Sequence, residues 1–208
     1  MAKPAPRRRS APQAPVPVRS RYDVVAIGAS AGGLNALTAT LRSLPHDFPG
    51  SIVIVQHLAP QHKSHLPELL ARATRLHVKQ AEHGEVILPG WIYVAPPDEH
   101  LLVGPGKLQL AHSQLVHFTR PSIDLLFESV AGTYGARSIG VILSGSGQDG
   151  ASGIQAIKES GGTTIVQTRA EFNSMPEAAL ATNSVDHSLS ADDIGPALMQ
   201  LCSGNGIR

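Results

Sequence analysis

The sequence lacks several features that would assign it to a particular class of protein. Its 208 residues contain a single cysteine, Cys202, which excludes an internal disulfide and fits a reducing cytoplasm. No run approaches the ~20 apolar residues that a membrane-spanning helix needs. The formal net charge is only +1, so the chain as a whole has no strong attraction to nucleic acid or to a membrane surface. We therefore expect a cytoplasmic protein with no membrane span and no nucleic acid partner.

The first 20 residues differ in composition from the rest of the chain. They are rich in Pro, Ala and Arg and have no apolar periodicity, so we predict that residues 1–20 form a disordered tail. No apolar segment follows the arginines at 7–9, which argues against an export signal. The tail either keeps the protein soluble or tethers it to an acidic partner or an anionic surface. Residues 21–204 are predicted to form one domain, and 205–208 a flexible end.

Short apolar runs alternate with helical patterns along the rest of the chain, which predicts an α/β fold. We expect a doubly wound, mostly parallel sheet flanked by helices. The predicted strands are 24–27, 51–55, 91–94, 139–143 and 163–166. The predicted helices are 33–43, 65–73, 122–134, 150–160, 176–181 and 191–202. Residues 98–111 alternate around a Gly-Pro-Gly turn and predict a β-hairpin.

The turn after the first predicted strand is the most informative segment, because Gly28, Gly32 and Gly33 bracket Ser30. Glycines allow the chain to turn tightly from a strand into a helix. A hydroxyl at this position lies beside a helix N-terminus, where backbone N–H groups stabilise a developing negative charge. Serine nucleophiles and their oxyanion sites are usually built in this way. Ser30 is therefore the candidate nucleophile.

Two other reactive side chains follow predicted strands. His57 comes directly after the second strand, and Asp149 lies in a Gly-rich loop after a later one. Because ligands bind outside the carboxyl ends of the strands in an open α/β sheet, we expect both side chains to approach Ser30. A hydroxyl, an imidazole and a carboxylate are the parts of a nucleophile, a general base and its orienting acid.

Other interpretations of these motifs remain. Ser30 alone could be a helix N-cap. The GASAGG segment differs from a dinucleotide fingerprint, because Ser30 occupies the place of the second glycine. His57, His62 and His65 have a spacing that suggests a metal site, but the intervening Pro60-Gln61 breaks the helical register that would align them. We expect neither a cofactor nor a metal.

Most other histidines lack any pattern of partner residues and are predicted to lie on the surface. His117 precedes the FTRPS segment and either lines the cleft or lies on the surface. The predicted surface histidines are His46, His77, His83, His100, His112 and His187.

The chain resembles the catalytic domain of the chemotaxis protein-glutamate methylesterases, the CheB-type family. The matching blocks follow in family order from about residue 22 to residue 181: IGASAGGLNAL, QHLAPQHKSHLPELLAR, YVAPPDEHLL, FTRPSIDLLFES, ILSGSGQDGASGIQAIKESGGTTIVQ and SMPEAAL. The resemblance implies that Ser30 is the nucleophile, His57 the base and Asp149 the orienting acid. It also implies a serine hydrolase without a cofactor, which demethylates glutamyl methyl esters on cytoplasmic chemoreceptor helices through an acyl-enzyme. Some members of the family also deamidate receptor glutamines.

The resemblance also suggests which residues surround the reacting atoms. Arg72 either steers acidic receptor helices toward the cleft or is simply a favourable charge at a helix C-terminus. The candidate oxyanion donors and cleft residues are Ala31, Gly32, Ser146, Gly147, Arg72 and Met175.

The chain departs from the family pattern in three places. Ala31 stands where the family commonly has threonine, and Ser146 stands where the loop before the acid commonly has methionine. These two departures motivate an alternative function, a degenerate module that binds a receptor or array partner without turnover. Two-domain members also carry an N-terminal receiver domain, which residues 1–20 are too few to form. We therefore expect an open active site or regulation by a separate receiver protein.

Overall fold

The buried apolar runs of the sequence become neighbouring strands of one sheet. The structure is a computed structural model that describes residues 23–58 and 64–204. The predicted tail, the predicted flexible end and His62 lie outside these residues, and the domain boundaries remain predictions. The strands of the main sheet are β1 (Val24–Ala29), β2 (Ser51–Gln56), β3 (His77–Gln80), β4 (Trp91–Val94), β7 (Ser138–Ile142), β8 (Thr163–Gln167) and β9 (His187–Leu189).

Six α-helices and a hairpin surround this sheet in the described part of the chain. The helices are α1 (Gly33–Leu41), α2 (Leu66–Ala71), α3 (Ile123–Tyr134), α4 (Ala151–Glu159), α5 (Ser174–Ala181) and α6 (Ala191–Cys202). A short 3-10 helix, Gly135–Arg137, follows α3. The hairpin pairs β5 (His100–Gly104) with β6 (Lys107–Ala111) in antiparallel fashion.

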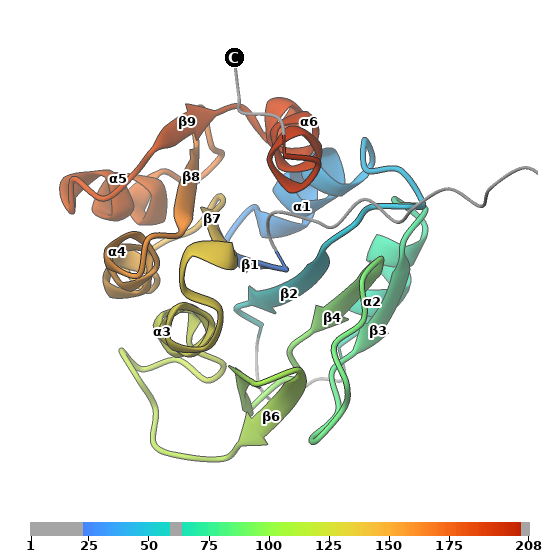
Figure 1. The fold of residues 1–208 in the computed structure, drawn as a ribbon. Helices are drawn as coiled ribbons and strands as arrows, with labels where there is room; N and C mark the ends of the chain where they lie inside the picture. The colour runs from blue at the N-terminus through green and yellow to red at the C-terminus, as the bar shows by residue number, and fades with distance from the viewer. Residues whose placement is uncertain (1–22, 59–63, 205–208) are drawn as a thin grey trace, which may run out of the picture.

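The sheet separates two hydrophobic cores, because its strands are apolar on both faces. One core joins the sheet to α1, α2 and α6, with Leu37 and Leu198 among its members. The other joins the opposite face to α3, α4, α5 and the hairpin, with Phe127 and Ile157 among its members. Figure 1 shows α6 and α1 on one side of the strands and α3 and α4 on the other.

The strand order brings the segments that follow β1, β2 and β7 together at the middle of the sheet. All seven strands are parallel, in the order β3-β4-β2-β1-β7-β8-β9. The chain runs from β1 to β2 on one side and later returns to β7 on the other side of β1. This reversal creates a topological switch point, where crevices form outside the carboxyl ends of the strands.

The predicted α/β fold, the parallel sheet and the hairpin are confirmed. The five predicted strands are present with small shifts at their ends, but the sequence analysis missed β3 and β9. Both are edge strands with half-exposed or exposed side chains. Edge strands are often short and polar, so they lack the apolar signal by which strands are recognised.

The prediction that His100 lies on the surface is wrong, because its side chain is fully buried. Its Nε2 lies 2.9 Å from the carbonyl oxygen of Gln114, and its Nδ1 accepts a hydrogen bond of 3.1 Å from the backbone N–H of Ser122. The hairpin packs against α3 and covers this imidazole. Both ring nitrogens are paired, as a buried polar group requires.

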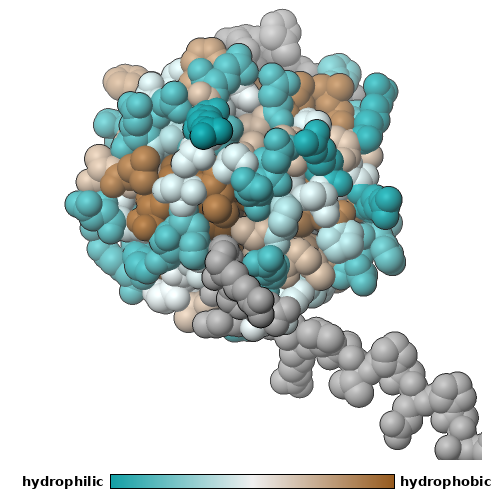
Figure 2. All heavy atoms as spheres, turned by 90° about the horizontal axis from the view of Figure 1, so that it is seen from above, coloured by the Kyte–Doolittle hydropathy of each residue, from teal (hydrophilic) through white to brown (hydrophobic). Residues whose placement is uncertain are grey.

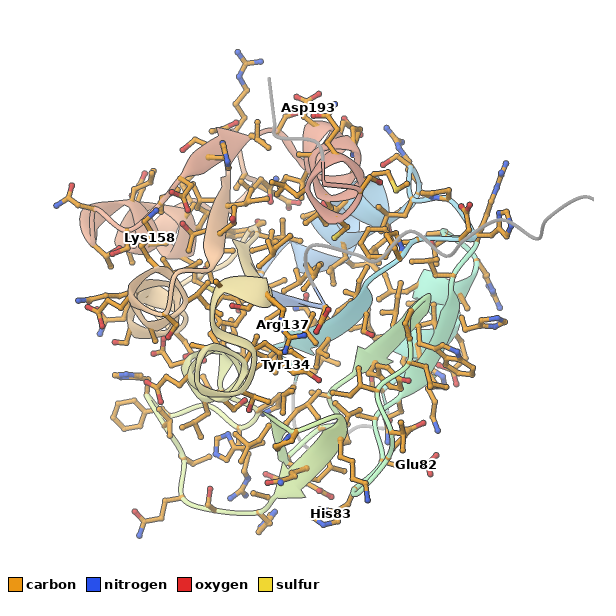
Figure 3. All side chains as sticks on the ribbon, viewed as in Figure 1. Glu82, His83, Tyr134, Arg137, Lys158 and Asp193 are labelled. Atoms are coloured by element: carbon orange, nitrogen blue, oxygen red, sulfur yellow. The ribbon has the colours of Figure 1, made fainter. Side chains whose placement is uncertain are left out.

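The outer surface carries hydrophilic side chains and ion pairs. On the face that includes α6, hydrophilic residues predominate and apolar ones gather in a few separate places (Figure 2). The Arg137 guanidinium lies 5.8 Å from the centre of the ring of Tyr134, the last residue of α3, and Figure 3 labels the two residues next to each other. No helix within residues 23–58 or 64–204 is long and apolar enough to cross a membrane.

Candidate active site

Ser30 lies at the turn between β1 and α1, in the middle of the switch point. Its backbone N–H donates to the carbonyl oxygen of Ser144, and its own carbonyl oxygen accepts from the N–H of Gly33, both at 2.9 Å. The first contact fastens the turn to the segment after β7, and the second closes the turn itself. The half-buried Ser30 lines a cavity of about 550 Å³.

Gln56 joins the backbones of the two residues that were predicted as nucleophile and base. Its Nε2 donates to the carbonyl oxygen of Ser30 at 2.7 Å and to that of His57 at 3.1 Å. Gln56 is only 8% exposed, so these bonds hold in a water-poor setting. The sequence analysis did not single out this residue. An amide in an otherwise apolar strand, directly before His57, was the available signal.

The imidazole of His57 and the carboxylate of Asp149 are in direct contact. His57 Nε2 lies 2.9 Å from Asp149 Oδ2, and Asp149 is only 4% exposed. This contact leaves His57 Nδ1 as the nitrogen that can receive a proton. Within the described residues no hydrogen bond joins the Ser30 hydroxyl to this imidazole. In enzymes without substrate such contacts are often long and tighten only in the complex.

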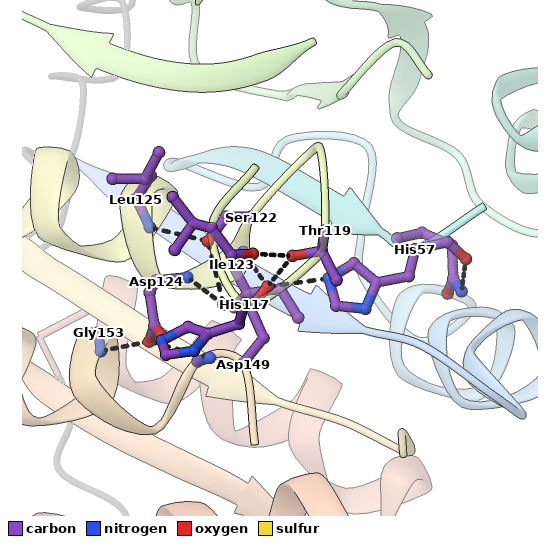
Figure 4. Close-up of polar contacts among 12 residues, drawn as sticks. His57, His117, Thr119, Ser122, Ile123, Asp124, Leu125, Asp149 and Gly153 are labelled. Atoms are coloured by element: carbon purple, nitrogen blue, oxygen red, sulfur yellow. Dashed lines mark hydrogen bonds and ion pairs between the residues drawn. The ribbon is translucent and has the colours of Figure 1, made fainter. Parts of the chain in front are cut away.

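Four donors besides His57 surround the carboxylate of Asp149 (Figure 4). The hydroxyls of Thr119 and Ser122 lie 3.1 Å and 3.0 Å from its oxygens. The backbone N–H groups of Ile123 and Asp124, in the first turn of α3, donate at 2.8 Å and 3.0 Å. Burial by itself would raise the pKa of Asp149, but the His57 contact and the two backbone N–H bonds outweigh it and lower the pKa to about 2. The carboxylate is therefore ionised at neutral pH.

Asp124 makes the reciprocal contact with α4, the helix that follows Asp149. Its Oδ1 accepts from the N–H of Gly150 at 2.9 Å and from that of Gly153 at 2.7 Å. Burial is the largest cause that raises the pKa of Asp124, to about 6, and the nearby Asp149 carboxylate adds to it. The N-terminus of α3 is thus capped by Asp149 from the loop before α4, and the N-terminus of α4 by Asp124 from the first turn of α3. The sequence analysis missed Asp124, although it lies in the quoted FTRPSID block.

The turn after Ser30 presents unpaired backbone donors. Gly32 adopts φ +70°, a conformation that favours glycine. The Ser144 hydroxyl binds the carbonyl oxygen of Ala31 at 2.8 Å, and in a planar trans peptide the N–H of Gly32 points the opposite way. Among the described residues, the N–H groups of Ala31 and Gly32 have no hydrogen-bond partner. They can therefore bind an oxyanion.

The loop after β7 brings the second predicted pair of donors to the site. Ser146 and Gly147 are exposed and line a small cavity together with His57, His117 and Asp149. His117, for which two locations were open, is half-exposed at the rim of this cavity. Its Nε2 lies 3.6 Å from Asp124 Oδ2.

Arg72 and Met175, the two remaining predicted cleft residues, are not among the residues that line the cavity beside Ser30. Arg72 is exposed and is the C-cap residue of α2. Met175 is 1% exposed, and its backbone N–H donates to the carbonyl oxygen of Gly145 at 3.0 Å. Its sulfur packs against Gly145, so this side chain supports the loop that carries Ser146.

The alternative of a metal site involves a residue outside the described part of the chain, His62. Among residues 23–58 and 64–204 no group of three or more His, Cys, Asp or Glu side chains could hold a metal ion. His65 is exposed and precedes α2 as its N-cap residue, as expected for a solvated helix entry.

Comparisons with known proteins agree with the observed fold. The family model for the CheB methylesterase matches residues 25–198. "Protein-glutamate methylesterase/protein-glutamine glutaminase 2" of Anaeromyxobacter dehalogenans is 44% identical over 88% of this chain. That match covers 54% of the relative, so the chain spans about half the length of the relative.

Two other comparisons cover nearly the whole of the matched protein. A "Putative protein-glutamate methylesterase/protein-glutamine glutaminase" of Leptospira interrogans is 41% identical over 88% of this chain and 97% of the relative. The crystal structure of the Thermotoga maritima CheB methylesterase catalytic domain superposes with a TM-score of 0.83 at 35% identity, over 86% of this chain and 98% of that one. Together with the family model, these matches show that the chain belongs to the CheB methylesterase family.

Proposed function

We propose that this chain is a cytoplasmic serine hydrolase that demethylates glutamyl methyl esters on a chemoreceptor-like protein in chemotaxis signalling. The observation that carries the proposal is the contact of 2.9 Å between His57 Nε2 and the ionised Asp149, at the switch point that also holds Ser30. The names of the relatives support this activity, and they also support deamidation of glutamine side chains by the same site.

The proposed reaction proceeds through an acyl-enzyme. The Ser30 hydroxyl oxygen attacks the ester carbonyl carbon while His57 Nδ1 takes the hydroxyl proton. The bond to the methoxy group then breaks, and methanol leaves with the proton that His57 returns. Water attacks the acyl-enzyme with the same imidazole as base, which releases a glutamate side chain and restores Ser30. For a glutamine side chain the leaving group is ammonia.

The surrounding residues lower the barrier in two ways. The negative charge on the carbonyl oxygen develops next to the N–H groups of Ala31 and Gly32 at the start of α1, and the N–H groups of Ser146 and Gly147 are the second proposed pair of donors. One oxyanion donor is typically worth about 10²–10³ in rate. Asp149 keeps the imidazole in one tautomer and stabilises the imidazolium that forms during each half of the reaction.

The proposal includes two partners. A methyl-accepting receptor-like protein is the proposed substrate, and a separate receiver protein is the proposed regulator. The alternative of an inert binding module requires an unreactive Ser30, whereas the comparisons support a hydrolase.

Methanol release from membranes that contain a methylated receptor tests this function. Wild-type protein should release methanol, and Ser30→Ala and His57→Ala should each abolish release. His46→Ala is the matched control, because His46 is exposed on a loop and, within the described residues, its side chain pairs only with its neighbour Asp47. Undiminished release by either active-site variant would contradict the proposal.

A further inference from the structure

A tight turn beside the active site adopts an unfavourable backbone conformation. Val116 and Thr119 exchange two backbone hydrogen bonds, of 3.1 Å and 2.9 Å. The two residues between them, His117 and Phe118, have φ of +48° and +63°. Positive φ at both central positions is typical of a two-residue hairpin turn that normally carries Asn-Gly. A bulky residue in this left-handed region costs roughly 1–2 kcal/mol.

The turn also exposes a large aromatic side chain. Phe118 is 95% exposed, more than any other large hydrophobic residue in the described part of the chain. Neither its exposure nor its backbone conformation stabilises the fold. Strained residues of this kind cluster at active sites and ligand clamps, where another requirement maintains them.

The turn is fastened to the His57–Asp149 pair. The Thr119 hydroxyl lies 3.1 Å from Asp149 Oδ2. The next residue, Arg120, donates to Asp98 Oδ1 from two nitrogens, at 3.0 Å and 2.7 Å. Two small cavities border His57, and both are lined by Phe118 and Thr119. Phe118 is therefore held at a defined place next to the proposed base.

Apolar surface also lines the separate cavity beside Ser30. Four leucines line the cavity beside Ser30. Leu34, Leu58 and Leu69 are 38–41% exposed, and Leu66 is buried. A glutamyl methyl ester needs only the space next to Ser30. Phe118 does not line the Ser30 cavity but lines the two cavities that border His57, so a molecule larger than the ester group is needed to contact it while the ester occupies the site.

We infer that Phe118 anchors the protein substrate, by packing against an apolar side chain that flanks the esterified glutamate on an amphipathic segment. The inference rests on the proposed function, because it assumes an ester carried by a polypeptide. The leucine-lined cavity and Phe118 contact the same segment on opposite sides of the ester. Aromatic anchors of this kind commonly dominate the affinity of an interface.

Binding is tested separately from turnover by using Ser30→Ala protein. Its Kd for membranes with methylated receptor should rise about tenfold when Phe118→Ala is added, as for an interface hot spot. Val86→Ala is the matched control, since Val86 is an exposed apolar residue that pairs with Lys107 and lines none of these three cavities, and it should leave the Kd unchanged. An unchanged Kd in Ser30→Ala/Phe118→Ala would overturn the inference.

Two further readouts distinguish the possible outcomes. Phe118→Gly should weaken binding to a similar extent and yet raise the Tm, because glycine adopts the positive φ without strain. This combination would not arise if the phenylalanine only supported the fold. If wild-type protein released no methanol while binding still depended on Phe118, the proposed function would fail and the anchoring role would stand.

Discussion

The N-termini of α1 and α3 lie close to the same active site but are used differently. At the start of α3, a carboxylate from another loop binds the N–H groups of Ile123 and Asp124. At the start of α1, Gly32 provides no side-chain cap, and the N–H groups of Ala31 and Gly32 have no partner among the described residues. Both helix ends favour negative charge.

The difference separates a permanent negative charge from a transient one. Asp149 occupies the α3 terminus at all times, and its low pKa makes it a poor proton acceptor. The α1 terminus stays open for the charge that appears on the substrate only during the reaction. His57 lies between the two and is the group that can move a proton.

The largest effect is expected from changing Asp149, which occupies the N-terminus of α3. Asp149→Asn removes the charge that orients His57, so kcat should fall by about 10³–10⁴. An amide also cannot accept from all of the surrounding donors, so the Tm should fall as well. Methanol release and thermal unfolding measure the two effects.

Asp186→Asn is the matched control for this variant. Asp186 accepts hydrogen bonds from Thr164 and forms an ion pair with Lys158 at the opposite end of the sheet. Its substitution should lower the Tm and leave kcat intact. Equal losses of kcat in the two variants would mean that Asp149 acts only through stability.

A smaller effect is expected from changing Gly32 at the N-terminus of α1, where the N–H groups have no partner among the described residues. Gly32→Ala puts a Cβ at φ +70°, 2.7 Å from the Ser144 hydroxyl that orients the Ala31 peptide. Displacing a donor in this way should lower kcat by roughly 10- to 100-fold, less than the loss of a full oxyanion site. Gly106→Ala is the comparison, because Gly106 has φ +69° and no neighbour within 4 Å of an added Cβ. It carries the same backbone strain, so it should lower only the Tm.

The smallest effect concerns the pH dependence of stability. The pKa of Asp124 is raised to about 6 in the folded protein, so the folded state binds its proton more tightly than the unfolded state. The contribution of Asp124 to the free energy of unfolding is therefore largest below about pH 4. It is lost as the pH rises through about 6, a loss on the order of 1–3 kcal/mol. Asp124→Asn should flatten this slope in urea unfolding measured from pH 4 to 7. An identical slope in wild type and variant would contradict the assignment.

The sequence located the segments that follow strand ends, but not the contacts that form across the fold. Ser30 and His57 follow buried strands that are neighbours in the sheet, and the switch-point rule places both at the carboxyl edge of the sheet. The role of Asp124 arises only because α3 packs beside α4, and no spacing in the sequence encodes that contact. His100 is buried for a similar reason, since its cover comes from the folding back of the hairpin.

Labelling of Ser30 by a serine-directed fluorophosphonate tests the central claim most directly, because this reagent reacts only with an activated hydroxyl and needs no receptor. The wild-type protein should be labelled at Ser30, and His57→Ala should be labelled far more slowly. Absence of labelling in the wild type, or equal rates in wild type and His57→Ala, would contradict the account.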